Sequence, residues 1–169
     1  MPVGPIILTA RMGKADFAWA DAQRRRHFPP DRNIVPAHIT LFHHLPPSIQ
    51  GELRVLMAHY RADTPPVARL SAVLNLGKGV GYRVESDELL MYRAEIADHF
   101  SGMLTPQDQA APRLHITVQN KVTAEAARAL YAELVSSFRP RPLTIAGLEA
   151  WEYQGGPWRP LFFVPFEGR

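Results

Sequence analysis

The sequence has 169 residues, of which 46% are hydrophobic and 21% are charged, and these proportions exclude a chain that is mainly disordered. It contains no cysteine, which excludes a disulfide framework, a thiolate nucleophile and a cysteine zinc site. The net charge of +3 is a mild basic bias that suits an anionic ligand without requiring one.

The apolar stretches of the chain are short. Residues 5–10 and 161–166 fall far below the roughly 20 residues that a membrane helix needs, so we predict no membrane span. The first five residues, Met-Pro-Val-Gly-Pro, do not form a charged region followed by a long apolar core, so we expect no secretory signal and a cytoplasmic location. The length fits a single domain over residues 1–169, built as two closely packed lobes.

Apolar periodicity predicts the elements of the first half. In chain order they are a strand at 5–12, a helix at 15–28, a strand at 38–45, a helix from Ser48 as N-cap to about residue 63, and strands at 67–76 and 80–85. The segment Gly77-Lys78-Gly79 between the last two strands is typical of a hairpin turn. The first half therefore alternates strands and helices before a hairpin.

The second half follows a similar order. We predict a helix at 87–103, a loop, a strand at 114–122, a helix from Thr123 as N-cap to Pro140, and a second hairpin formed by 143–153 and 161–166. The triplet His-Ile-Thr occurs in both halves, 77 residues apart (115 − 38 = 77). This duplication predicts an α+β fold of two lobes related by a pseudo-two-fold axis, each with an antiparallel sheet and flanking helices.

Both triplets fall on predicted strands. Because residues two apart on a strand share a face, His38 points the same way as Thr40, and His115 the same way as Thr117. The central isoleucines point the other way and anchor each strand in its lobe. The pseudo-symmetry then predicts that the two imidazoles and the two hydroxyls face each other across a shared cleft.

Two imidazoles across a cleft suit phosphoryl transfer by acid–base catalysis, because near pH 7 one can accept a proton while the other donates one. On a 2′,3′-cyclic phosphate, one histidine would deprotonate water and the other would protonate the leaving ribose oxygen. Thr40 and Thr117 would hydrogen-bond the non-bridging phosphate oxygens. This chemistry requires no metal and no other cofactor, and it leaves open which histidine is the acid.

Other polar residues near the triplets have simpler interpretations. Strand alternation predicts that His43 faces away from His38, and His44 lies about 20 Å further along the strand at about 3.3 Å per residue, so we predict surface residues and no metal site. The run from Arg24 to Arg26 is interpreted as a solvated helix face, with phosphate-backbone binding as the alternative.

Residues 36–42, Pro-Ala-His-Ile-Thr-Leu-Phe, and residues 113–118, Arg-Leu-His-Ile-Thr-Val, resemble the paired motifs of the 2H phosphoesterase superfamily. This superfamily includes bacterial 2′,5′ RNA ligase-like proteins and RNA 2′,3′-cyclic phosphodiesterases. The resemblance covers nearly the whole chain. It implies a bilobal fold with both motifs in a central groove, catalysis without metal or nucleotide cofactor, His38 and His115 as catalytic residues, and Thr40 and Thr117 as phosphate-binding residues.

The sequence departs from the family pattern after each motif. RNA ligase-like members usually continue the first motif as Leu-x-Phe-x-Gly, whereas this chain has Leu-Phe-His-His-Leu at 41–45, and they often carry an arginine after the second motif, where this chain has Gln-Asn-Lys at 119–121. Lys121 is a candidate to supply the positive charge; exposure at the end of the strand is the alternative. Trp151, Tyr153 and Trp158 could stack on a nucleobase at the mouth of the groove, or pack the core of the second lobe.

The sequence thus predicts a metal-independent phosphoesterase that acts on a 2′,3′-cyclic phosphate or a 2′,5′-phosphodiester of a nucleotide or RNA end, by hydrolysis or by ligation in reverse. No membrane and no obligate protein partner is expected. Two alternatives stay open: a phosphodiesterase for a non-nucleotide substrate, and a non-catalytic module that uses the same groove to bind RNA or a phosphorylated ligand.

Overall fold

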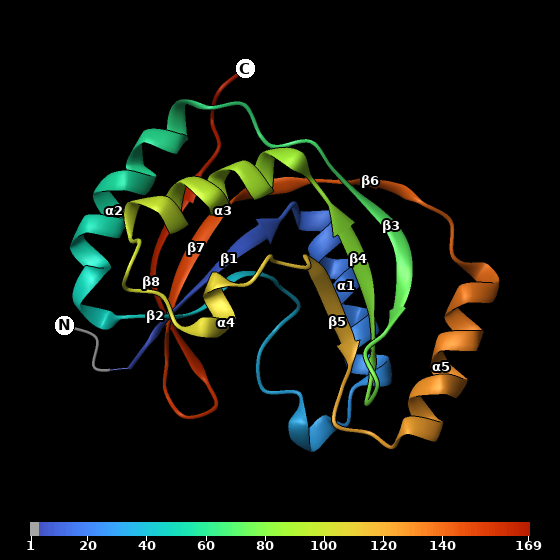
Figure 1. Ribbon diagram of the computed structural model, residues 1–169. Helices are drawn as coiled ribbons and strands as arrows, with labels where there is room; N and C mark the ends of the chain where they lie inside the picture. The colour runs from blue at the N-terminus through green and yellow to red at the C-terminus, as the bar shows by residue number, and fades with distance from the viewer. Residues whose placement is uncertain (1–3) are drawn as a thin grey trace.

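Two four-stranded antiparallel sheets with flanking helices form the protein, as Figure 1 shows for the computed structural model, which describes residues 4–169. The elements in chain order are β1 (Ile6–Met12), α1 (Lys14–His27), β2 (Ile39–Leu45), α2 (Gln50–Ala58), β3 (Ala68–Asn75), β4 (Val80–Glu85), α3 (Asp87–His99), α4 (Pro106–Gln109), β5 (His115–Gln119), α5 (Ala124–Ser137), β6 (Arg141–Leu143), β7 (Ile145–Tyr153) and β8 (Trp158–Pro165). Residues 1–3, part of the stretch in which we expect no secretory signal, lie outside the described residues. Within 4–169, no helix combines the length and the apolar character needed to cross a bilayer.

The predicted strands and helices are confirmed in order, with local corrections at their ends. Thr123 caps α5 as predicted, because its side chain accepts a hydrogen bond from the backbone of Ala126. The cap predicted at Ser48 is wrong: this residue lies inside a short 3-10 helix, and α2 starts only at Gln50. Helix α3 is shorter than predicted, and part of the following loop forms α4, capped by Thr105.

The strand order reveals how the duplication is organised. The sheets run β2-β1-β7-β8 and β5-β4-β3-β6, so the two triplet strands, β2 and β5, occupy equivalent edges. The repeating unit is β-α-β-α-β: β1 to β3 form the first copy, and β4 to β7 the second. Strand β7 begins 77 residues after β3 (145 − 68 = 77), the same offset as the triplets. The hairpin β3–β4 therefore spans the junction of the repeats. The last strand of each repeat pairs with the first strand of the other repeat: β3 with β4, and β7 with β1.

The predicted strand 143–153 is divided between the two sheets. Strand β6 pairs with β3, and after Thr144 the chain continues as β7, which pairs with β1. Asp16 in α1 fixes this crossover: its carboxylate accepts bonds from the backbone nitrogen and hydroxyl of Thr144, at 2.8 and 2.7 Å, and from Arg141 at 2.8 Å. Burial alone would raise the pKa of Asp16, but these hydrogen bonds lower it.

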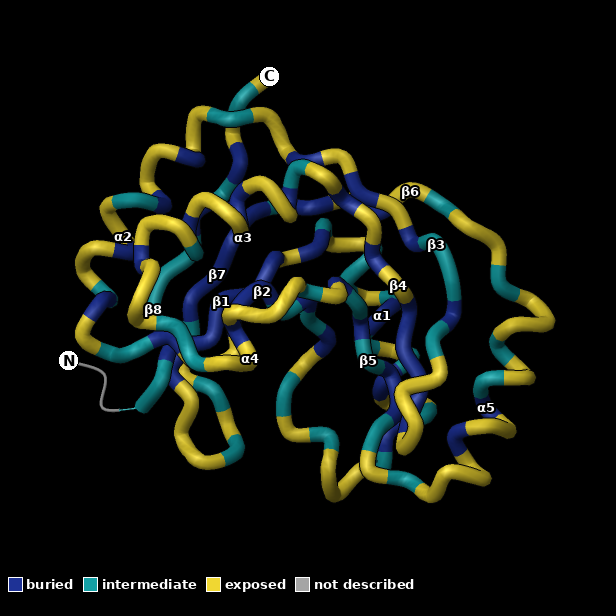
Figure 2. The backbone as a smooth tube through the Cα atoms, viewed as in Figure 1, coloured by how far each residue is buried: buried dark blue, intermediate teal, exposed yellow. Residues whose placement is uncertain are grey.

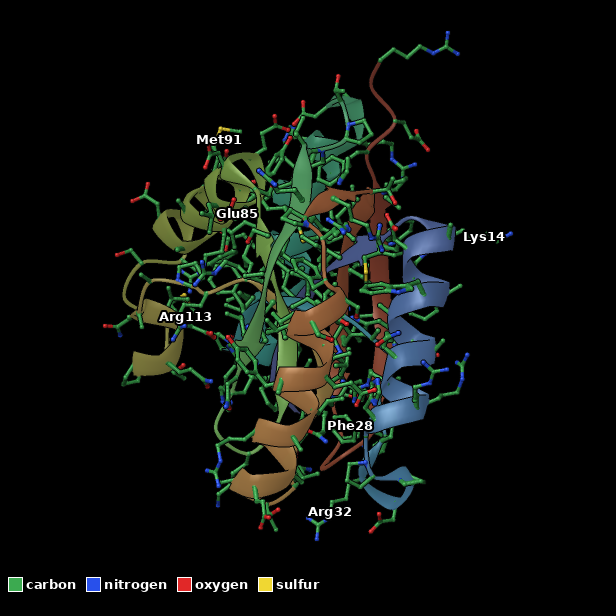
Figure 3. All side chains as sticks on the ribbon, turned by 90° about the vertical axis from the view of Figure 1, so that its right-hand side faces the viewer. Lys14, Phe28, Arg32, Glu85, Met91 and Arg113 are labelled. Atoms are coloured by element: carbon green, nitrogen blue, oxygen red, sulfur yellow. The ribbon has the colours of Figure 1, made fainter. Side chains whose placement is uncertain are left out.

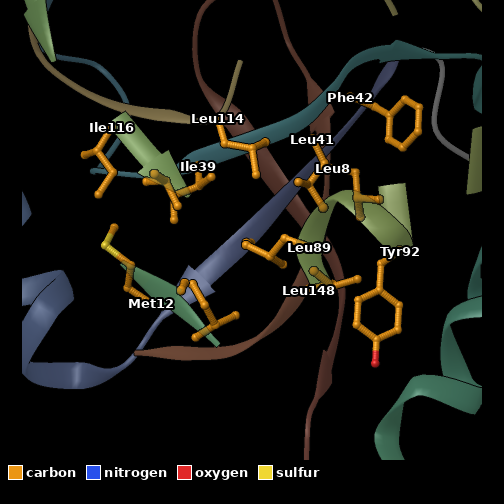
Figure 4. Close-up of a cluster of buried hydrophobic side chains, with 14 of the residues drawn as sticks. Leu8, Met12, Ile39, Leu41, Phe42, Leu89, Tyr92, Leu114, Ile116 and Leu148 are labelled. Carbon is orange, nitrogen blue, oxygen red and sulfur yellow. The ribbon is translucent and has the colours of Figure 1, made fainter. Parts of the chain in front are cut away.

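The helices cover the sheets from outside, and each sheet receives a helix from the other repeat. Helix α1 packs against β5, and α5 against β3 and β4, so that α1 and α5 lie side by side in Figure 3. Leu89 and Tyr92 of α3 lie next to Leu8 of β1 and Leu148 of β7, in the sheet β2-β1-β7-β8 (Figure 4). Figure 2 shows the result: the strands β1 and β7 are mostly buried, and the outward faces of α2 and α5 are exposed.

Candidate functional site

The two triplets meet where the edge strands β2 and β5 contact each other. His38 immediately precedes β2, and His115 is the first residue of β5. The central isoleucines Ile39 and Ile116 are fully buried in the shared apolar cluster (Figure 4), whereas the histidines and threonines of both triplets are partly exposed. The alternation predicted from sequence is therefore present at both triplets, with the polar side chains facing out of the core.

The two imidazoles are held in the same way. Nδ1 of His38 lies 2.8 Å from the carbonyl oxygen of Pro36, and Nδ1 of His115 lies 2.6 Å from that of Arg113. Because a carbonyl oxygen can only accept, Nδ1 carries the hydrogen in both rings. Nε2 is then the nitrogen that remains to exchange protons, as a lone pair in the neutral ring or as a donor in the protonated one.

Two pockets of about 270 Å³ each combine the triplets crosswise. One contains His38 together with Thr117, and the other contains His115 together with Thr40. Within residues 4–169, no hydrogen bond engages the hydroxyl group of either threonine. Each pocket thus presents one imidazole and one unengaged hydroxyl, supplied by different repeats.

The environment of His38 favours the neutral imidazole. Burial lowers its pKa to about 4, although the hydrogen bond to Pro36 acts in the opposite direction. The positive charge of Arg24 lowers the pKa of His38 further. The ring of Trp158, whose centroid lies 4.6 Å away, covers one side of the imidazole. At neutral pH His38 therefore has a free lone pair on Nε2.

Arg24 corrects the interpretation of the basic run as a solvated helix face. Its side chain is 3% exposed and lines the pocket of His38, where Nη1 donates to the carbonyl oxygen of Thr117 at 3.1 Å. Burial lowers its pKa to about 10, so it stays cationic at neutral pH. Only Arg25 and Arg26 are exposed, and Arg25 pairs with Asp21. Arg24 lies four residues after Ala20 and four before Phe28, both buried, so helical spacing is the signal that could have placed it on the face that packs against β5.

The other predicted site residues lie around His38. Lys121, Tyr153 and Trp158 line the pocket that contains His38 and Thr117. Lys121 has a φ of 62°, a left-handed conformation that ends β5 and turns the chain beside the pocket. These three residues are therefore assembled at one end of the site, as the hypothesis of ligand contact requires.

Trp151 belongs to a larger, mostly apolar pocket of about 570 Å³ that also borders His38. Its Nε1 donates to the hydroxyl of Thr9 at 3.0 Å, which fixes the indole on the sheet. Trp158 and His38 line both this pocket and the smaller one. The remaining apolar walls include Phe17 and Phe163. The pocket has the size and character to hold an organic group attached to a phosphate at His38.

His43 corrects a second prediction, because it does not face away from the site. It lines the pocket that contains His115. Directly after Thr40 the register between β1 and β2 slips, so that Leu41 is the extra residue of a β-bulge, and both it and Phe42 are buried. The bulge reverses the alternation and turns the next polar side chain outward. In the sequence, two apolar residues in a row are followed by two histidines, at 41–44. This break in strict alternation is the signal that could have revealed the bulge.

The polar groups at the site are mainly imidazoles, hydroxyls and cationic side chains. Arg93 of α3 lines the pocket of His115, as Arg24 of α1 lines that of His38, and each donates to a backbone carbonyl of the opposite triplet strand. Among the described residues, no group of three or more histidine, cysteine, aspartate or glutamate side chains is arranged as a metal-binding cluster. The chemical character of both small pockets suits an anion such as a phosphate.

Comparison with known proteins gives one sequence match and many structural ones. The sequence matches the model of the 2′-5′ RNA ligase superfamily over residues 14–157. No curated protein matches it. Among solved structures, it is similar to TT0787 of Thermus thermophilus, with 13% identity, a TM-score of 0.64 and coverage of 98% of this chain and 99% of the other. E. coli LigT complexed with NADP+ has 14% identity and a TM-score of 0.63, and the match covers 99% of each chain. E. coli LigT complexed with 3′-AMP has 14% identity and a TM-score of 0.57, and the match covers 98% of this chain and 99% of the other. At these identities, the structural matches establish a shared fold.

Proposed function

The chain belongs to the 2′-5′ RNA ligase superfamily, and we propose that it is a metal-independent phosphoesterase for a 2′,3′-cyclic phosphate or a 2′,5′-phosphodiester of a nucleotide or RNA end. The observation that carries this proposal is the crosswise pairing of His38 with Thr117 and of His115 with Thr40 in two pockets on the contacting strands β2 and β5. A phosphate bound between the two pockets would have one imidazole and one hydroxyl on each side. The LigT complexes with 3′-AMP and with phosphate support a ligand of this class.

The proposed reaction on a cyclic phosphate uses each histidine once. Nε2 of His38 takes a proton from water as the water oxygen forms a bond to phosphorus. The bond from phosphorus to one ribose oxygen breaks, and that oxygen receives the proton of Nε2 of His115. The product is a phosphate monoester, and Thr40 and Thr117 donate hydrogen bonds to the non-bridging oxygens as negative charge builds on them. Ligation to a cyclic phosphate follows the same sequence with a ribose hydroxyl in place of water: His38 takes the proton of that hydroxyl, its oxygen bonds to phosphorus, and the product is a phosphodiester.

The assignment of His38 as base follows from its surroundings. A base must enter the reaction with a free lone pair, and burial lowers the pKa of His38 to about 4. The hydrogen bond from its Nδ1 to Pro36 leaves Nε2 as the acceptor. His115 then provides the acid, from the opposite edge strand. Both rings are thereby oriented before substrate binds, which reduces the entropic cost of reaching the transition state.

The remainder of the substrate is assigned to the apolar pocket beside His38. Trp151 and Trp158 line it, with ring centroids 6.0 Å apart, and offer faces on which a nucleobase can stack. Stacking is tolerant of base identity because every base has a π face. This arrangement favours a nucleotide over a phosphodiester with small aliphatic substituents.

The assignment of His38 makes a specific prediction for the pH dependence of kcat/KM. A base must be deprotonated to act, so activity rises with pH through its pKa, and this acidic limb should lie at about pH 4 rather than near the ordinary histidine value of about 6.5. Activity at pH 5 should therefore remain close to the plateau. An acidic limb centred between pH 6 and 7 would contradict the assignment of His38 as base in the free enzyme.

Turnover with chelator present tests the function itself. The purified protein should open a 2′,3′-cyclic nucleotide, or a cyclic-phosphate-terminated oligonucleotide, at an equal rate with and without excess EDTA. The product is measured as a phosphate monoester by chromatography. Loss of activity in EDTA would contradict a metal-independent mechanism, and binding without turnover across a panel of phosphodiesters would instead favour the binding module.

A further inference from the structure

The bulge that exposes His43 has a counterpart in the second repeat. On β5 the register to β4 also slips directly after the threonine, with Val118 as the extra residue. Asn120 consequently lines the pocket of His38, just as His43 lines the pocket of His115. The two positions are 77 residues apart (120 − 43 = 77), the offset of the triplets. The fold thus presents a third polar side chain to each pocket, and in one of them this side chain is an imidazole.

A buried carboxylate holds His43 in place. Asp108 of α4 is completely buried, and its Oδ1 and Oδ2 accept hydrogen bonds from the backbone nitrogens of His43 and His44, both at 2.8 Å. Nδ1 of the His43 ring lies 3.4 Å from Oδ1 of the same carboxylate. Burial alone would raise the pKa of Asp108, but the hydrogen bonds from His43 and His44 lower it, so the group is ionised.

The ring of His43 is nevertheless accessible to a ligand. Its side chain is 49% exposed, and within residues 4–169 its Nε2 forms no hydrogen bond. A buried carboxylate that orients one ring nitrogen while the other faces a pocket is an arrangement that positions a histidine for a ligand. A purely structural role for Asp108 would be met by the two backbone bonds alone.

The pocket around His43 is cationic. Arg93 is 7% exposed, and its Nε donates to the carbonyl oxygen of Leu41 at 3.2 Å while Nη2 donates to that of Asp108. Arg113, which is labelled in Figure 3, follows the loop after α4. It lines the same pocket. None of the described residues that line this pocket is acidic. The buried carboxylate of Asp108 offsets part of this positive charge from within the core. Arg93 and Arg113 nevertheless line the pocket, and guanidinium groups bind phosphate oxygens well.

We infer that this pocket binds a second phosphate group of the substrate, adjacent to the reacting one, and that His43 selects for it. The inference rests on the proposed function, because it takes the reacting phosphate to lie between His38 and His115. It narrows the substrate class to a nucleotide or RNA end that carries a further phosphate, such as one on the 5′ oxygen of the same ribose. A phosphodiester with an uncharged remainder would leave the part of the pocket around His43 empty.

Titration calorimetry with two probes tests this subsite without requiring turnover. The probes are adenosine 3′-monophosphate and adenosine 3′,5′-bisphosphate, which differ only in the second phosphate. The wild-type protein should bind the bisphosphate about 10-fold or more tightly than the monophosphate, the effect of one charge-assisted contact. His43→Ala should abolish this preference. His44→Ala is the matched control, because His44 is the exposed neighbour that does not line the pocket, and it should retain the preference.

The possible results separate the subsite from the function. Equal affinities of the wild-type protein for the two probes would overturn the subsite alone. So would a preference that survives in His43→Ala but is lost in Lys121→Ala, because that would place the second phosphate in the pocket of His38. Failure of the wild-type protein to bind either probe would overturn the proposed function and the subsite with it. Thermal unfolding of each variant verifies that the fold is retained.

Discussion

His38→Ala and His115→Ala are each expected to lower kcat by about 10²–10⁴-fold, the usual contribution of a general acid or base. In both rings Nδ1 is held by a backbone carbonyl, so Nε2 is the only nitrogen that can move a proton. The loss should fall mainly on kcat, because cationic groups on both sides of the site still hold the phosphate. Steady-state kinetics on a 2′,3′-cyclic nucleotide measure both parameters.

Two further variants separate proton transfer from positioning. His115→Asn retains a side-chain donor for the carbonyl of Arg113 but has no group that titrates near neutral pH, so it should be as inactive as His115→Ala. His59→Ala is the matched control, because this exposed histidine lies in a short 3-10 helix away from the site. Activity of His115→Asn within about threefold of wild type would contradict proton transfer by this ring.

The double variant His38→Ala/His115→Ala should be little worse than either single variant. The proposed acid and base act on the same phosphorus in one step, and residues that act as a unit show strongly non-additive losses. If the two losses multiplied, the histidines would instead serve separate steps or separate substrates.

The secondary structure and the polar faces of the triplet strands were largely predictable from sequence. Alternation is a local property, so His38-Ile39-Thr40 already specifies which side chains leave the core. The repeat offset of 77 residues likewise predicted the pseudo-symmetry of the two lobes. The cap at Thr123 could also be predicted, because capping depends on only a few neighbouring residues.

The features that were missed depend on contacts between distant segments. Strand alternation assumes a regular ladder, and the bulge at Leu41 breaks it, which is why His43 was assigned to the wrong face. The burial of Arg24 arises from the packing of α1 on the sheet of the other repeat. The division of the strand at Thr144 depends on Asp16, 128 residues earlier in the chain. Neither the bulge nor the contact between Asp16 and Thr144 leaves a periodic signal.

The exchange of strands and helices between the lobes has a consequence for the site. Each pocket contains a histidine from one repeat and a threonine from the other, and Arg24 and Arg93 each bond to the triplet strand of the opposite repeat. A relative shift of the two lobes would therefore disturb both pockets at once. The two buried arginines each tie a helix of one repeat to the triplet strand of the other, and the proposed proton transfer requires such a rigid placement of the two imidazoles.

Thr40→Val and Thr117→Val are expected to lower kcat by about 10²–10³-fold each, the usual cost of removing one donor to a developing oxyanion. Valine preserves the branched shape and strand preference of threonine, so the change removes only the hydroxyl group. Thr40→Ser and Thr117→Ser retain the hydroxyl and should keep most of the activity, which makes them matched controls. Unfolding temperatures of the four variants should remain close to that of the wild-type protein, because neither hydroxyl has a partner within residues 4–169.

The double variant Thr40→Val/Thr117→Val distinguishes two arrangements of the phosphate. If the hydroxyls bind different non-bridging oxygens, their contributions are independent and the two losses in kcat should multiply. If both donate to the same oxygen, the second substitution should cost much less than the first. Multiplying losses, together with similar effects of the two single variants, would agree with a phosphate that lies on the pseudo-two-fold axis between the pockets. Wild-type kcat in Thr40→Val or Thr117→Val would show that the hydroxyl concerned does not contact the reacting group.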